Sequence, residues 1–163
     1  MALANVERLD HGSTDGSLAR GLHREVISGV GDTTNAYQLK VGQSGSLCLF
    51  DAADGVVYTL PAPVVGTQFD FLVTVAGTSN SYSIDTDAAT TFIGGGVGSF
   101  STTVAEGGDS FAADIAATVS VDLDSDVTGR LVGTAFSLTC TSSTTWVISG
   151  NLHGVGTLAT PFA

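Results

Sequence analysis

Short runs of alternating apolar and polar residues fill the chain from Tyr37 onward, with Gly, Asn, Asp and Ser clusters between them. A period of two is typical of strands that bury one face, and evenly spaced turn clusters are typical of an antiparallel sandwich or barrel. We expect strands over residues 37–41, 46–50, 56–60, 68–76, 82–86, 99–104, 118–124, 131–141 and 145–149. The pattern therefore predicts an all-β chain whose single domain is an antiparallel β-sandwich, similar to a jelly roll.

Three of these runs show which side chains should form the core. Their inward positions are Phe69, Phe71, Val73 and Val75; Val119, Val121 and Leu123; and Phe136, Leu138 and Cys140. The four polar residues 141–144 separate the run that contains Phe136 from the apolar residues 146–148, and they predict a hairpin between these two strands. The Ala-rich residues 109–117 are compatible either with a short helix, capped by Asp109 or Ser110, or with no helix.

The first 36 residues have a different pattern. They show little alternation and are interrupted by five glycines, so residues 1–36 are predicted to be an extended N-terminal arm. The arm precedes a body, residues 37–163, that ends in an apolar tail. An extended terminus stays ordered only where something holds it, so we expect the arm to lie against its own body or a neighbouring subunit.

Charge is distributed unevenly between these regions. The chain has 16 acidic and 5 basic residues, a net charge of −11. Residues 1–40 hold four of the basic residues and five acids, whereas residues 41–163 hold only Arg130 against eleven acids. This balance argues against nonspecific binding of nucleic acid, which needs clustered Lys and Arg. No apolar stretch approaches 18 residues and the first dozen residues carry charges, so we expect neither a membrane span nor a secretory signal.

The cysteines, histidines and glycines show no spacing typical of a chemical centre. Cys48 and Cys140 lie in apolar runs without metal-site spacing, which favours buried free thiols over a disulfide. The histidines, His11, His23 and His153, are widely spaced and are interpreted as surface or subunit contacts. The segment 94–98 is glycine-rich without the Lys of a phosphate loop, which indicates a turn or a close backbone approach.

The densest acidic group is residues 122–126. It lacks the Gly and Glu that a calcium loop needs at its sixth and twelfth positions, where Val127 and Gly133 stand. Alternation explains the group as a solvated acidic strand edge, with a weak cation site as the alternative. No nucleophile elbow or catalytic constellation is present, so we expect no enzyme activity, no cofactor and no metal.

Several runs resemble small structural proteins of tailed-phage virions, especially head decoration proteins, also called cement proteins. The runs are VYTLPAPVVGTQFDF (57–71), TSNSYSI (78–84), TFIGG (91–95), GTAFSLTC (133–140) and TWVISG (145–150). The resemblance covers about residues 56–150 and leaves the arm unmatched. It implies a sandwich or jelly-roll module, commonly a trimer, that binds the major capsid protein on the outer surface of an icosahedral head. It implies that the protein has no active site. It also implies that assembly takes place in the host cytoplasm, where both cysteines would stay reduced.

The arm supplies the predicted contacts with the capsid, because the strongly acidic body is poorly suited to lie on another acidic shell. The predicted partner-contact residues are Arg8, Arg20, Arg24, His11 and His23 in the arm, with Leu158 and Phe162 in the tail. Deleting residues 1–36 is expected to abolish capsid binding and leave a folded body. The alternative is a phage fibre, spike or receptor-binding module that binds carbohydrate. That function needs exposed aromatic rings, whereas Trp146, the one tryptophan, is predicted to be a core residue.

Overall fold

The structure is a computed structural model that describes residues 24–29, 36–78, 81–103, 105 and 107–163. The described residues form eleven strands and one short 3-10 turn, so the predicted all-β class is confirmed. The elements are β1 (Val26–Ile27), β2 (Tyr37–Gln38), η3 (Val41–Gln43), β3 (Leu47–Phe50), β4 (Val56–Thr59), β5 (Gln68–Val73), β6 (Tyr82–Asp85), β7 (Phe92–Ser101), β8 (Gly108–Ala113), β9 (Ser120–Leu123), β10 (Ala135–Cys140) and β11 (Thr145–Gly154). In the described part of the chain no helix has the length and apolar character that crossing a membrane requires.

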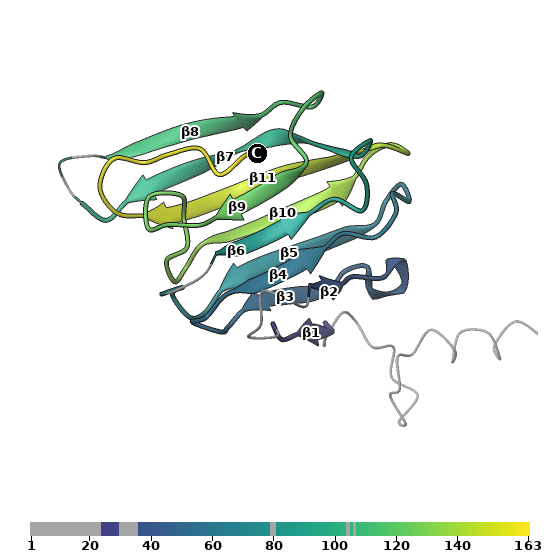
Figure 1. Ribbon diagram of the computed structural model, residues 1–163, viewed down its shortest axis with the longest axis horizontal. Helices are drawn as coiled ribbons and strands as arrows, with labels where there is room; N and C mark the ends of the chain where they lie inside the picture. The colour runs from purple at the N-terminus through teal and green to yellow at the C-terminus, as the bar shows by residue number, and fades with distance from the viewer. Residues whose placement is uncertain (1–23, 30–35, 79–80, 104, 106) are drawn as a thin grey trace, which may run out of the picture.

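The strands form two sheets. The larger sheet has the order β1-β3-β5-β10-β11-β7-β8, and the smaller has the order β2-β4-β6-β9 (Figure 1). From β1 to β7 the chain alternates between the two sheets, and each strand from β3 to β6 returns beside its predecessor in the same sheet, whereas β7 lies between β11 and β8. A strand that returns in this way runs parallel to that predecessor, as β1, β3 and β5 do.

The predicted antiparallel direction is therefore wrong for much of the molecule. Among the described strand pairs, five are parallel and four are antiparallel. Alternation of apolar and polar residues is the same in both kinds of pair, so the pattern did not distinguish them. The one connection predicted as a hairpin, residues 141–144, is confirmed, since β10 and β11 pair antiparallel across it.

The expected strand at 99–104 is the end of the longer strand β7, and the helix considered for residues 109–117 is not formed. Its first part is strand β8, which pairs antiparallel with β7 and turns Phe111 and Ala113 toward the core. The chain then turns, and the amides of Ala117 and Thr118 donate to the carbonyl oxygen of Asp114. Pairing with β7 thus outweighs the weak helical preference of a short Ala-rich stretch.

One hydrophobic core receives side chains from both sheets. Phe50 of β3 stacks on Tyr82 of β6 at 4.9 Å between ring centroids and meets the edge of Tyr58 of β4 at 5.4 Å. Trp146 is fully buried, as predicted, and so are Cys48 and Cys140, which are both free thiols. Of the ten residues predicted to face inward, eight are buried: Phe69, Phe71, Val73, Val121, Leu123, Phe136, Leu138 and Cys140. Val75 and Val119 are the exceptions, because both lie just outside their strands and are only partly covered.

Glycines let neighbouring strands approach closely. Gly95 in β7 has φ +94°, and a Cβ there would lie 2.4 Å from the carbonyl oxygen of Ile148. Gly150 in β11 has φ +151°, and a Cβ there would lie 2.4 Å from the Cα of Phe136. For the segment 94–98, close backbone approach is confirmed and a turn is wrong, since these residues lie inside β7.

The N-terminal part of the described chain belongs to the larger sheet. Strand β1 pairs with β3, and Ile27 is buried in the core. The carbonyl oxygen of Ile27 lies 3.2 Å from the hydroxyl of Tyr58. Residues 24–29, predicted as part of the arm, therefore pack on the body. A deletion of residues 1–36 would remove this strand, so a truncation that tests the arm has to stop before residue 24.

Candidate interaction surface

The outer face of the seven-stranded sheet carries small and apolar side chains in rows that the strand register defines. One row is Val26, Leu47, Asp70, Ser137, Ser149, Gly96 and Ala112. The next row is Leu49, Leu72, Ala135, Asn151, Gly98 and Ser110. We call the outward residues of these two rows the neutral face. They alternate along each strand with the buried core residues.

The neutral face has one acidic residue, Asp70, and no basic residue. Its charge is balanced by Arg24, with which Asp70 forms an ion pair. The Arg24 guanidinium also donates to the carbonyl oxygens of Gly45, at 2.8 Å, and Ser46, at 3.2 Å. These bonds hold the guanidinium over β5 at the edge where β1 joins the sheet.

Two shallow hollows lie on this surface. The first, of about 370 Å³, is lined by Leu47, Asp70, Leu72, Ala135, Ser137 and Ser149 together with backbone of their neighbours. The second, of about 350 Å³, lies over β7 and β8, where Gly96, Gly98, Ser110 and Ala112 line it. The second hollow follows from the small size of these residues, which leaves the pleated backbone near the surface.

The outer face of the four-stranded sheet differs from the neutral face in its size and in its charge. Its outward residues are Gln38, Val57, Thr59, Ser83, Asp85, Ser120 and Asp122. The Ser120 hydroxyl donates to the Asp122 carboxylate at 2.8 Å. Partial burial, and then the nearby Asp122 carboxylate, raise the pKa of Asp85 above its ordinary value. We call this surface the acidic face.

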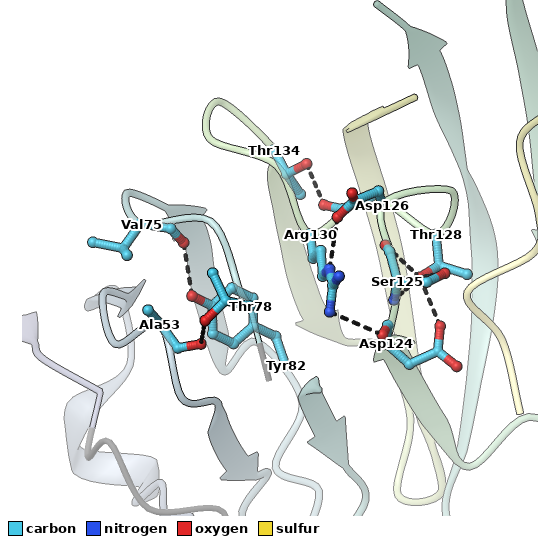
Figure 2. A network of polar contacts seen from close by, with 11 residues as sticks. Ala53, Val75, Thr78, Tyr82, Asp124, Ser125, Asp126, Thr128, Arg130 and Thr134 are labelled. Atoms are coloured by element: carbon cyan, nitrogen blue, oxygen red, sulfur yellow. Dashed lines mark hydrogen bonds and ion pairs between the residues drawn. The ribbon is translucent and has the colours of Figure 1, made fainter. Parts of the chain in front are cut away.

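A polar network braces the loop between β9 and β10 at one end of the molecule (Figure 2). Asp126 accepts a hydrogen bond from Nε of Arg130 at 2.8 Å, and Nη1 of Arg130 donates to the carbonyl oxygen of Asp124 at 3.3 Å. The Asp124 carboxylate accepts a bond from the Thr128 hydroxyl at 2.9 Å. These carboxylates thus each hold a partner within their own loop. Among the described residues, no group of three or more His, Cys, Asp or Glu is placed to hold a metal ion.

The same end of the molecule is tied through Tyr82. Its hydroxyl lies 2.7 Å from the carbonyl oxygen of Val75 and 2.9 Å from that of Ala52 (Figure 2). Nearby, the Thr78 hydroxyl donates to the carbonyl oxygen of Ala53 at 3.1 Å. The loops after β3 and β5 are therefore fastened to strand β6 of the other sheet.

The two cysteines are poor nucleophiles in this fold. Burial, with smaller contributions from Asp70 and Glu25, raises the pKa of the Cys48 thiol to about 12. Burial also raises the pKa of Cys140, whose thiol donates to the carbonyl oxygen of Ser142. A thiol reacts as its thiolate, so both side chains are inert near neutral pH.

The predicted partner-contact residues fall in three places. Arg8, His11, Arg20 and His23 lie outside the described residues. Arg24 is held by its own body, as given above. In the tail, Leu158 is half-buried beside Gly154, and Phe162 packs against the core and bridges to Val121 of β9. Arg24 and Phe162 are thus attached to different sheets.

The tail continues the four-stranded sheet along β9. The amides of Val119 and Ser120 donate to the carbonyl oxygen of Ala163, and the amide of Asp122 donates to that of Pro161. His153, the one histidine among the described residues, lies with its ring centroid 6.4 Å from that of Phe100. The contact roles predicted for these residues toward other chains stay predictions.

The neutral face is the surface that sequence reasoning missed. A signal was present, because residues 131–163 contain no Asp, Glu, Lys or Arg although they supply two central strands. Comparison with protein-family models, with curated proteins and with solved structures gives no match to this chain.

Proposed function

We propose that the chain is a structural protein of a tailed-phage virion that decorates the outer surface of the head and binds the major capsid protein. The observation that carries this proposal is the neutral face, a broad uncharged surface on a molecule of net charge −11. Broad contact surfaces with little charge at their centre are typical of proteins that work by assembling with others. The resemblance of residues 56–150 to head decoration proteins supplies the kind of assembly.

In this proposal the two sheets pack as a β-sandwich, with mixed strand directions in place of those of an antiparallel jelly roll. The contact with the capsid is supplied by residues 1–23, which precede the first described residue, Arg24. The acidic face points toward solvent, where charge favours solubility and does not oppose docking. Assembly takes place in the host cytoplasm, and the finished protein lies on the virion surface.

The test uses heads of the phage that carries this chain, produced without it. Purified chain is added, and the amount that sediments with the heads is measured together with the temperature at which the heads release DNA. We expect saturable binding and a higher release temperature, and both should be lost when residues 1–23 are deleted. A full chain that does not bind such heads contradicts the proposed function. A deletion variant that binds as tightly as the full chain contradicts the role of the arm.

The carbohydrate-binding alternative has few rings to use. Trp146 is buried, and Phe100, 51% exposed, is the one exposed aromatic residue among those described. Stacking on sugars needs an accessible ring, so the alternative depends on Phe100. Binding of the purified chain to a glycan array, abolished by Phe100→Ala, would support the alternative in place of head decoration.

A further inference from the structure

We infer that two copies of this chain pack against each other through the neutral face. The inference rests on the proposed function only in taking this face as an assembly surface, and it names a second copy as the partner there. It does not involve the head, so the two ideas can fail separately.

Charge is the first reason for choosing a second copy. Each copy carries a net charge of −11, and most of the acidic residues in the described part of the chain lie in loops or on the acidic face. Two copies that met through those surfaces would repel each other. Contact between two neutral faces brings no unpaired charge together, since Asp70 is already paired with Arg24. A two-fold axis satisfies this condition, because it places the same patch on both sides of the interface.

Area is the second reason. The seven strands contain 44 residues. At about 3.3 Å per residue and about 4.8 Å between strands, the whole outer face of this sheet, of which the neutral face is part, covers about 700 Å². A stable interface buries about 800 Å² on each partner. The four-stranded sheet contains 14 residues and covers about 220 Å² by the same measure, which is too small.

The side chains of the neutral face are suited to close packing. Ser137 and Ser149 lie opposite each other at its centre, with their hydroxyl oxygens 3.4 Å apart. The glycines of β7 and the alanines of β8 and β10 add little height above the backbone, so the backbones of two such sheets can approach closely. At the margin near β1, Val26 is 57% exposed and lies beside Leu47, which supplies apolar area to bury.

The test is sedimentation velocity on the full chain between about 1 and 100 µM. We expect the wild type to associate into an even number of copies. The variant Ser149→Glu places a charge at the centre of the face in both copies, and it should weaken association at least tenfold. The matched control is Ser83→Glu, the same change on the acidic face, which should associate as the wild type does. Thermal unfolding of each variant checks that it is folded.

Several outcomes would overturn the inference. One is a wild type that stays monomeric at 100 µM while a variant without residues 1–23 associates, because the N-terminal segment would then cover the face. Another is a wild type that stays monomeric with and without that segment. A third is a trimer that Ser149→Glu leaves intact, since its contacts would lie elsewhere. A fourth is a Ser149→Glu variant that associates normally but no longer binds heads, because the face would then belong to the capsid protein.

Discussion

The two outer faces of this protein are built on the same alternation but differ in what they present to their surroundings. On the larger sheet the central outward residues are serines, such as Ser137 and Ser149, and the one carboxylate is paired. On the smaller sheet Asp85 and Asp122 stand on adjacent strands, and the pKa of Asp85 is raised. The inner faces of both sheets are apolar and meet in one core. The difference shows that folding requires apolar residues on the inner face of each strand. The residue types of the outer face can instead vary with what that face contacts.

The largest expected effect comes from a glycine of strand β7, which carries part of the larger sheet. Gly95→Ala should lower the free energy of unfolding by at least about 2 kcal/mol, because the residue combines a positive φ with a contact against the backbone of Ile148. The control is Gly42→Ala, where a Cβ meets no atom within 4 Å. Urea unfolding measures both variants. Equal stabilities would mean that close strand approach does not support the larger sheet.

A smaller effect is expected from Tyr58→Phe, which tests how the two sheets are joined. The Tyr58 hydroxyl lies 2.7 Å from the carbonyl oxygen of Leu49 and 3.2 Å from that of Ile27. Its loss should cost about 1–2 kcal/mol, because it removes a hydrogen bond in a buried setting. The half-buried Tyr37→Phe serves as the control in the same urea titration. If Tyr58→Phe costs no more than the control, the contact does not hold β1 in place.

The ion pair between Arg24 and Asp70 should affect association between copies more than it affects the free energy of unfolding. Arg24→Met leaves Asp70 unpaired, and its exposed setting limits the stability loss to less than about 1 kcal/mol. Association measured by sedimentation should weaken, and added salt should partly restore it because it screens the unpaired carboxylates. Lys40→Met, which removes an exposed charge outside the strands, should leave association unchanged. The reverse ranking of the two variants would contradict the importance of neutrality.

The smallest effect is expected on the acidic face and has the opposite sign. The folded state raises the pKa of Asp85, so the ionised carboxylate destabilises the fold above that pKa. Asp85→Asn should therefore raise the melting temperature at pH 7 by a few degrees or less, corresponding to at most about 1 kcal/mol. The gain should shrink as the pH falls through the raised pKa and vanish below the unfolded value. A gain that persists at pH 3 would contradict an electrostatic cause.

The sequence predicted the buried positions better than the directions of the strands. Alternation identified Phe69, Phe136 and Leu138 as core residues because burial of every second residue is a local property. Strand direction depends on how the chain crosses between sheets, and neither the crossings of β1 to β6 nor their parallel pairing leaves a local signal. Strand β1 was missed because two residues are too few for a period to be visible.

The candidate surface was only partly accessible from the sequence. In the sequence, net charge separates residues 1–40 from the rest of the chain. In the structure, charge differs between the two outer faces of one body, since Asp85 lies on the smaller sheet and Ser149 on the larger. Arg24 was predicted to meet a partner, and its ion pair with Asp70 was invisible because the two residues are brought together only by the pairing of β1, β3 and β5. The absence of charge after residue 130 was the available sign of the neutral face.

The most direct measurement compares the accessibility of the two faces within the assembled protein. Ser149→Cys and Ser83→Cys place one reactive thiol on the neutral face and one on the acidic face, against native cysteines that are buried and unreactive. Maleimide labelling rates are measured for both variants at about 1 and 100 µM protein. We predict that labelling at residue 149 slows at least tenfold at the higher concentration, while labelling at residue 83 does not change. Equal rates at both concentrations for residue 149 would contradict the assignment of the neutral face as the contact between copies.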